Sequence, residues 1–288
     1  MAAGELGRRL AVAGVGIPVA VLLIGLGGWP LGVVLAAAAG GTALELFRLA
    51  GHTGVRAFES VGAVAAAGLV LLATATRDAA VMAQWAWPAI LGLALLLPGL
   101  AVWRRGPDGR PLAASAITLI GALLIGGGLA HAPLLRHLGD PSVWTGSVLL
   151  AFPIALTWVG DSCAYFAGRS WGRAKLIPSV SPGKTVVGAV ANAAGTVLLG
   201  AGYAWLVLRP AGLPVGPGTG AVIGVAVTVA GQVGDLAESL VKREAGVKDS
   251  GGLLPGHGGL LDRADSLLYT IPVTYWAFVA AFAVWGRG

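Results

Sequence analysis

Acidic, basic and hydroxyl side chains recur at helical spacing near residue 240, in a pattern that suits phosphate chemistry. Between Gly234 and Arg243 the polar residues stand at i, i+3, i+4 and i+7, in the order Asp235, Glu238, Ser239 and Lys242. On a helix these side chains share one face. The spacing therefore predicts a polar helix face, either as part of a charged site or as an amphipathic helix end with internal ion pairs.

A glycine-rich segment follows, from Val247 to Ser266. Its glycines and proline disfavour a helix, and successive backbone N–H groups of such a loop can bind phosphate oxygens. Near its end Asp262, Asp265 and Ser266 stand at i, i+3 and i+4, so we expect them on one face at the start of a helix. Two carboxylates suit a cation such as Mg²⁺, and a helix N-terminus favours an anion. A helix cap would explain Asp262 alone, but not a loop between two carboxylate pairs.

A second polar segment lies between residues 161 and 188. Its Gly183-Lys184-Thr185 sequence matches the end of a P-loop, but Pro178 stands where that motif needs its first glycine, and no strand is expected before it. We therefore exclude a P-loop. What remains is a basic, hydroxyl-rich loop suited to polyphosphate, in which the candidate binding residues are Ser181, Lys184 and Thr185.

Two aspartates stand at or inside the ends of apolar stretches. They are Asp161 and Asp235, and an ionisable group at membrane depth is a functional candidate by default. We expect Asp161 to complete a polar cavity or to pair with Arg169. The single cysteine, Cys163, cannot form a disulfide within the chain, and with four histidines it gives no zinc-type spacing.

The composition indicates a membrane protein. Of the 288 residues 56% are hydrophobic and only 11% are charged, against about 25% charged in a typical soluble domain. The 19 basic and 13 acidic residues are too few to coat a soluble body of this size. This excludes an ordinary cytosolic enzyme, a disordered tail and a nucleic-acid binder built on a soluble fold.

Apolar runs long enough to cross a bilayer, which takes about 20 residues, predict the fold class. We expect an all-α integral membrane protein, a polytopic bundle of about nine transmembrane helices. The predicted spans are Leu10–Gly25, Pro30–Leu46, Val61–Ala75, Ala80–Trp103, Leu112–Ala130, Val143–Phe166, Val186–Leu208, Val215–Leu236 and Leu267–Trp285.

The distribution of basic residues predicts the orientation. With nine spans, 15 of the 19 Lys and Arg residues fall on the side of the N-terminus and 4 on the other, and positive charge marks the cytoplasmic side. We expect a multi-pass protein of the plasma or inner membrane, with its first span retained and its N-terminus and polar loops in the cytoplasm. Residues 1–140 would form a scaffold, dimer interface or lipid groove, and residues 141–288 would carry the catalytic loops.

The two polar segments together resemble a known signature. The motif Ser239-x-x-Lys242-Arg243-x-x-x-x-Lys248-Asp249-Ser250-Gly251-x-x-Leu254-Pro255-Gly256-His257-Gly258-Gly259-x-x-Asp262-Arg263-x-Asp265-Ser266 closely resembles that of phosphatidate cytidylyltransferases, the CDP-diacylglycerol synthases. A second block begins at Asp161 and includes Ser181-Pro182-x-Lys184-Thr185-x-x-Gly188. It departs from the family pattern at Gly183, where a lysine is usual, and at Val186-Val187, where Trp-Glu is usual.

This resemblance implies a membrane enzyme that joins CTP and phosphatidate to give CDP-diacylglycerol and pyrophosphate. It also implies a requirement for Mg²⁺, with one or two divalent ions bound, and a homodimer whose active site opens to the cytoplasm. The expected partners are the two substrates and membrane lipid, and no nucleic acid.

The resemblance also implies roles for individual residues. Divalent ions would be held by Asp235, Asp262 and Asp265. Substrate charge would be neutralised by Lys242, Arg243, Lys248 and Arg263. The phosphates would be wrapped by Gly256, His257, Gly258 and Gly259, and further substrate contacts would come from Ser181, Lys184, Thr185, Ser239 and Asp249.

Two other classes of protein remain as alternatives. One is a CTP-using membrane kinase for a polyisoprenol or phytol, which would release CDP rather than pyrophosphate. The other is a transporter with buried carboxylates as ion sites. Transporters often contain internal repeats with broken helices in both halves, and no such repeat is visible here.

Overall fold

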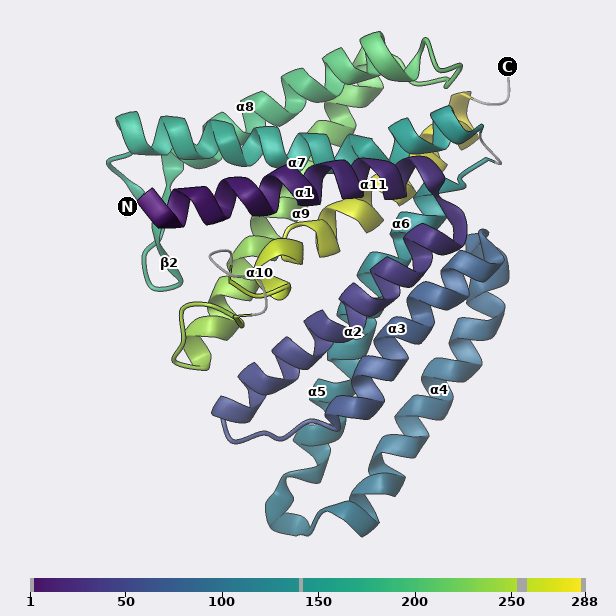
Figure 1. The fold of residues 1–288 in the computed structure, drawn as a ribbon, viewed down its shortest axis with the longest axis vertical. Helices are drawn as coiled ribbons and strands as arrows, with labels where there is room; N and C mark the ends of the chain where they lie inside the picture. Colours follow the sequence, from purple (N-terminus) through teal and green to yellow (C-terminus); the bar gives the residue numbers. More distant parts are fainter. Residues whose placement is uncertain (1–2, 140–141, 253–257, 286–288) are drawn as a thin grey trace. The chain divides into compact units, whose positions relative to one another are not determined.

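The computed structural model describes residues 3–139, 142–252 and 258–285. Helices dominate the described chain (Figure 1), and a single hairpin is its described sheet. The elements, in chain order, are α1 (Ala3–Leu26), α2 (Gly28–His52), α3 (Glu59–Thr76), α4 (Ala79–Arg104), η1 (Pro107–Gly109), α5 (Pro111–Ala122), η2 (Leu123–Gly127), α6 (Gly128–Arg136), α7 (Val143–Trp171), β1 (Lys175–Ile177), β2 (Ser181–Thr185), α8 (Val186–Tyr203), η3 (Ala204–Leu208), α9 (Pro217–Glu244), α10 (Leu261–Ala264) and α11 (Leu267–Trp285).

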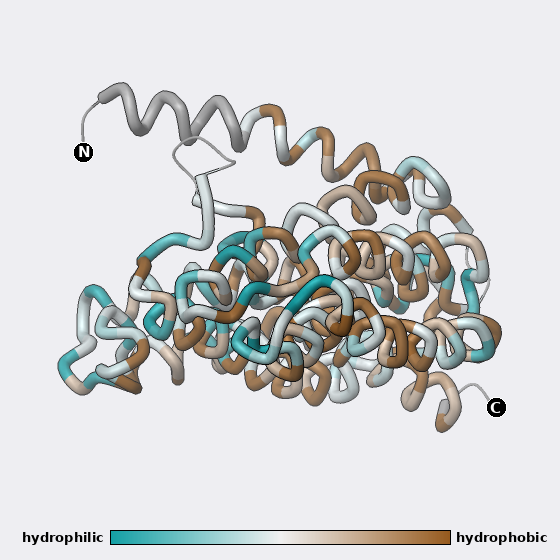
Figure 2. Tube along the Cα trace, turned by 90° about the horizontal axis from the view of Figure 1, so that it is seen from below, coloured by the Kyte–Doolittle hydropathy of each residue, from teal (hydrophilic) through white to brown (hydrophobic). Residues whose placement is uncertain are grey.

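The predicted spans coincide with helices. Eight helical segments of the described chain are long and apolar enough to cross a membrane, and they match the second to the ninth predicted span. The first predicted span lies in α1, whose Gly14–Leu26 part is apolar but shorter. Hydrophobic residues run along these helices in Figure 2. The prediction of an all-α, polytopic membrane protein is confirmed.

Two local features differ from a simple set of straight spans. The fifth span is α5 and α6 joined by the π-helical turn η2, and α8 likewise continues into the π-helical η3. The antiparallel hairpin of β1 and β2, with Lys175 opposite Thr185, was not predicted, and the expectation that no strand precedes Pro178 is wrong because β1 ends at Ile177. Short strands outside the apolar stretches give no hydropathy signal, which is why composition alone missed them.

The contacts divide the chain into two compact units. Unit 1 comprises Met1–Leu134 and Val241–Ala264, and unit 2 comprises Leu135–Leu240 and Asp265–Gly288. Segment 241–264, which carries most of the glycine-rich loop, therefore packs with the N-terminal helices. The functional division at residue 140 stays a prediction, because these units are defined by packing and not by role.

Unit 1 contains the helices α2, α3, α4 and α5, which lie alongside one another (Figure 1). The ring of Phe47, on α2, is fully buried in this unit. Gly62 of α3 and Gly121 of α5 both face this ring, and a Cβ at Gly121 would lie 2.5 Å from it. The two glycines therefore make room for one large side chain between three helices.

Unit 2 is built around α7, α8, α11 and the part of α9 up to Leu240. Phe152 packs edge-on against Tyr203 and Phe278, with ring centroids 5.3 and 5.2 Å apart. Small residues let the backbones of α8 and α9 approach closely, since a Cβ at Gly224 would lie 2.7 Å from the carbonyl oxygen of Thr196. This contact brings together α8 and α9, two of the helices that carry polar residues.

The polar motifs lie on elements that agree only in part with the sequence. As expected, α9 continues to Glu244, so the polar face from Asp235 to Lys242 lies on one helix. The expectation of one helix face for Asp262, Asp265 and Ser266 is wrong, because α10 ends at Ala264 and α11 begins at Leu267. The carboxylate of Asp265 accepts the Ser266 N–H at 2.6 Å, which offers that donor a partner outside a continuous helix.

Candidate active site

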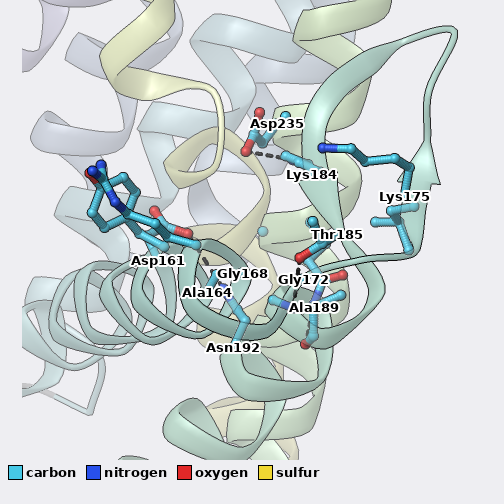
Figure 3. A pocket seen from close by; sticks show the side chains of 17 residues that line it. Asp161, Ala164, Gly168, Gly172, Lys175, Lys184, Thr185, Ala189, Asn192 and Asp235 are labelled. Atoms are coloured by element: carbon cyan, nitrogen blue, oxygen red, sulfur yellow. Dashed lines mark hydrogen bonds and ion pairs between the residues drawn. The ribbon is translucent and has the colours of Figure 1, made fainter.

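A polar cavity of about 540 Å³ lies within unit 2 (Figure 3). Its walls come from α7, the β1–β2 hairpin, α8 and α9. The polar side chains that line it include Asp161, Lys175, Lys184, Asn192, Gln232 and Asp235. Both acidic and basic groups thus face one space inside a unit whose helices are otherwise apolar.

One ion pair joins the hairpin to α9 across this cavity. The ammonium of Lys184 lies 2.5 Å from the carboxylate of Asp235 (Figure 3), and the two side chains are 24% and 34% exposed. An ion pair that remains accessible to water is worth only about 0–1 kcal/mol. A highly charged ligand could therefore replace either partner at little energetic cost.

Thr185 has a structural role in the wall of the cavity. It is the N-cap of α8, and its hydroxyl oxygen accepts the Gly188 N–H at 3.1 Å. A Cβ at Gly168 would lie 2.9 Å from the same oxygen, so that glycine allows α7 to approach the cap. Thr185 is buried and holds the hairpin to α8. Its predicted contact with substrate stays a prediction.

Asp161 lines the cavity from α7, in agreement with one of the two roles considered for it. Its carboxylate accepts a hydrogen bond from the Asn192 amide at 3.4 Å. Arg169 instead donates to the hydroxyl of Tyr165 at 3.0 Å. Sequence reasoning missed Asn192 and Gln232, although each is an amide inside a predicted apolar span, which is a visible signal.

Three carboxylates of unit 2 come together beside the C-terminal half of α9. Oxygens of Asp235, Glu238 and Asp265 all lie within 4.8 Å of one another, and Glu238 is buried. Carboxylates this close repel one another unless a cation or protons neutralise them. Mg²⁺ prefers hard oxygen donors and usually binds through one or two carboxylates while it keeps several waters, so two of these three acids would be enough to hold it. Of the three predicted metal ligands, the structure thus brings together Asp235 and Asp265. The third acid of this cluster is Glu238, which the sequence analysis did not name as a metal ligand.

Asp262, the remaining predicted ligand, belongs to unit 1. Its Oδ1 accepts a hydrogen bond from the Lys242 ammonium at 2.7 Å, and both side chains are largely buried, at 9% and 13% exposed. Its Oδ2 accepts from the backbone N–H of Ser250 at 2.9 Å and of Gly259 at 2.8 Å. The carboxylate therefore ties α9 to both sides of the glycine-rich loop.

A glutamate that the sequence reasoning missed lies next to this network. Glu45 of α2 is 4% exposed, and its carboxylate accepts the Ser250 hydroxyl at 3.0 Å and the Leu261 N–H at 2.9 Å. The available signal was its position, because Glu45 is the only acidic residue inside a predicted span before residue 143. An ionisable group placed there is a functional candidate by default.

The other predicted site residues differ in exposure. The exposed side chains are those of Arg243 on α9, Lys248, Asp249 and Arg263 on α10, whereas Ser239 is buried and Ser181 is half-buried. Gly256 and His257 lie outside the described residues. Gly258 has a φ of 77°, a conformation that favours glycine, and a Cβ there would lie 2.7 Å from the Asp262 carboxylate. Whether these residues contact substrate stays a prediction.

Comparison with known proteins gives matches along most of the chain. It is 38% identical over 224 residues to a phosphatidate cytidylyltransferase of Brucella suis, covering 73% of this chain and 78% of the relative. It is 31% identical over 300 residues to a phosphatidate cytidylyltransferase of Synechocystis, covering 96% and 98%. An uncharacterized protein, YnbB of Escherichia coli, is 41% identical over 148 residues, and this match spans 51% of the chain and 48% of that relative. The sequence pattern of the Cytidylyltransferase family matches residues 7–281, so the chain belongs to this family.

Proposed function

We propose that this protein transfers the cytidylyl group of CTP to phosphatidate and so supplies CDP-diacylglycerol for phospholipid synthesis. The observation that carries the proposal is the polar cavity of unit 2, where Lys175, Lys184 and Asp235 face one space within a membrane-spanning bundle. Family membership and the relatives named phosphatidate cytidylyltransferase support the same reaction. A charged nucleotide and a lipid phosphate both need such a polar site at the edge of a bilayer.

The reaction places few demands on acid–base chemistry. A phosphate oxygen of phosphatidate forms a bond to the α-phosphorus of CTP, while the bond from that phosphorus to the oxygen bridging the β-phosphate breaks. The electron pair of the broken bond leaves with pyrophosphate. The attacking oxygen is already anionic near neutral pH, so catalysis depends mainly on positioning and on neutralising charge.

The chain's own cations suit this task. Lys184 reaches the cavity from β2 and Lys175 from β1, and both can pair with phosphate oxygens when nucleotide enters. In the structure the Lys184 ammonium pairs with Asp235, and an incoming phosphate would compete with that carboxylate for it. Unit 1 contributes further positive charge near the glycine-rich loop, from Lys242 and from the exposed Lys248, Arg243 and Arg263.

We propose that Mg²⁺ binds at the carboxylates of Asp235, Glu238 and Asp265. When bound, it would neutralise polyphosphate charge and help the pyrophosphate leave. Asp262 remains a candidate ligand from the sequence, although its described contacts hold the glycine-rich loop. Mg²⁺ bound there would also relieve the repulsion among the three acids, of which Glu238 is buried and the other two are half-buried.

We also propose that the polar loops face the cytoplasm and that the protein forms a homodimer. The orientation rests on the excess of Lys and Arg, 15 of 19, on the side of the N-terminus under the nine-span topology. The dimer rests on the family resemblance.

A labelling experiment tests the reaction. Detergent-purified protein is given phosphatidate, Mg²⁺ and CTP carrying radiolabel on either the α- or the γ-phosphate. We expect α-label in chloroform-extractable lipid, γ-label in pyrophosphate, and loss of both with EDTA or without phosphatidate. With a lipid alcohol as acceptor, γ-label in the lipid and release of CDP would instead identify a kinase and contradict the proposal.

A further inference from the structure

Glu45 is a buried carboxylate in the N-terminal half of the chain, far in sequence from the polar motifs. It lies on α2 and is 4% exposed. Its Leu261 partner is 216 residues away in the sequence. A buried carboxylate is costly unless it is hydrogen-bonded, so a membrane helix that retains one needs a reason beyond packing.

The hydrogen bonds of Glu45 bracket the glycine-rich loop. One carboxylate oxygen, Oε2, accepts the Ser250 hydroxyl at 3.0 Å and the Leu261 N–H at 2.9 Å. Ser250 precedes the loop's first glycine pair, and Leu261 follows its last. A single oxygen atom on α2 therefore bonds the chain on both sides of the loop's glycine pairs.

Ser250 connects Glu45 to Asp262. Its hydroxyl lies 3.0 Å from Glu45 Oε2 and 2.9 Å from Asp262 Oδ2. A serine hydroxyl has one proton, so it donates to only one of these carboxylates at a time. The Leu261 N–H keeps Glu45 bonded in either case, while the backbone N–H of Ser250 keeps Asp262 bonded. The arrangement fixes the position of Asp262, and through it that of Lys242 at 2.7 Å.

The glycines of the loop fit the Glu45 side chain. A Cβ at Gly251 would lie 2.6 Å from Glu45 Oε1 and 2.9 Å from its carboxyl carbon, and its three nearest neighbours are all Glu45 atoms. A Cβ at Gly259 would collide with Glu45 Oε2 and with the Ser250 hydroxyl. Side chains at these positions would therefore push the carboxylate out of place.

We propose that Glu45 is a positioning residue for the reaction. It clamps both ends of the glycine-rich loop to α2 and so orients Asp262 and Lys242 for substrate, without touching substrate itself. The proposal rests on the function proposed above and adds a contribution from the N-terminal half of the chain. A positioning role differs from a purely stabilising one in its consequence. Loss of the Glu45 contacts would alter the kinetic constants of protein that is still folded.

Four variants separate the effect of the length of the Glu45 side chain from the effects of its charge and of added volume next to it. Glu45→Gln keeps an oxygen at the same reach, which can still accept both donors. Glu45→Asp keeps the charge but withdraws it by one carbon–carbon bond. Glu45→Ala removes the acceptor, and Gly251→Ala adds a methyl group against it. Glu59→Gln, which removes the exposed glutamate in the first turn of α3, is the matched control.

The kinetic constants for CTP and phosphatidate are measured well below each variant's thermal midpoint. Because misplacing reacting groups by about 1 Å can cost on the order of 100-fold, we expect Glu45→Ala to lower kcat about 30- to 100-fold and to raise the KM for CTP. We expect about a 10-fold loss for Glu45→Asp, and less than about 3-fold for Glu45→Gln and for the control. A variant that only unfolds more easily would lose active protein at an unchanged KM.

The double variant Glu45→Ala with Gly251→Ala gives a second test. Removing Glu45 clears the space that the Gly251 methyl group needs, so the double variant should be no worse than Glu45→Ala alone. If the activity losses of Glu45→Ala and Gly251→Ala multiply in the double variant, the proposal is wrong. Wild-type kinetic constants in Glu45→Asp and Glu45→Ala would also refute it. If Glu45→Ala does not fold, activity in Glu45→Gln with loss in Glu45→Asp supports the clamp, and the reverse order overturns it. Failure of the wild-type protein to make CDP-diacylglycerol would instead refute the proposed function.

Discussion

The carboxylate of Asp262 joins α9 to the glycine-rich loop, and its replacement by asparagine is the most informative single change. Oδ1 accepts from the Lys242 ammonium, and Oδ2 accepts from the backbone N–H groups of Ser250 and Gly259. An asparagine side chain has one oxygen. If that oxygen serves the two backbone donors, the amide NH₂ faces the ammonium of Lys242, and two donors then oppose each other.

The burial of the Lys242–Asp262 ion pair determines the free-energy cost of this substitution. Lys242 and Asp262 are 13% and 9% exposed, so the remaining ammonium stays largely buried. Removing one partner of a buried ion pair costs about 3–5 kcal/mol, and residual contact with water favours the lower end. About 3 kcal/mol corresponds to roughly a 100-fold lower population of the ordered loop. We therefore expect Asp262→Asn to lose at least about 100-fold in activity while the membrane helices stay folded.

The assay measures stability and activity in parallel. Thermal unfolding in detergent reports the first, and transfer of α-labelled CTP into lipid reports the second. The double variant Asp262→Asn with Lys242→Met removes the largely buried ammonium as well. We expect it to recover most of the thermal midpoint but none of the activity, because both groups are needed to orient substrate. Asp108→Asn, at an exposed aspartate of η1, is the control.

Two results would refute this reasoning. Wild-type activity in Asp262→Asn would show that neither the charge nor the ion pair matters for the reaction. A double variant that is as unstable as Asp262→Asn would show that the cost does not come from the buried ammonium of Lys242.

Two further predictions concern unit 2. Thr185→Val removes the N-cap of α8 and should lower the free energy of unfolding by about 1 kcal/mol, measured as a lower thermal midpoint, with Thr185→Ser close to wild type. Glu238→Gln removes one carboxylate from the acidic cluster and should raise the Mg²⁺ concentration for half-maximal activity about 10- to 100-fold, by comparison with loss of a partner around a metal ligand. An unchanged Mg²⁺ titration would remove Glu238 from the proposed metal site.

The sequence predicted the membrane fold because bilayer thickness imposes a length on each apolar run. Hydropathy alone therefore located the helices, and the spacing from Asp235 to Lys242 placed four polar residues on one face of α9. Spacing fails where a side chain competes with the helix, and this is what happens at Asp265, which accepts the next backbone N–H. The break between α10 and α11 lies at this contact, which no periodicity shows.

Contacts between distant segments could not be predicted in the same way. Glu45 meets Ser250 across 205 residues, and Asn192 meets Asp161 across 31. Sequence spacing says which residues share a helix face, but not which faces meet. A search for lone polar residues in apolar spans would have found both Glu45 and Asn192, without revealing their partners.

The glycines of the loop show how the same residues can support two different explanations. From the sequence, Gly258 and Gly259 are expected to present backbone N–H groups to phosphate. In the structure the Gly259 N–H donates to Asp262 at 2.8 Å, and the space above Gly259 is filled by Glu45 and Ser250. Glycine is required there to let carboxylates approach the backbone, whether or not phosphate binds nearby. The loop is thus shaped by acids from two other elements of unit 1, and its capacity to hold a nucleotide depends on how firmly those acids hold it.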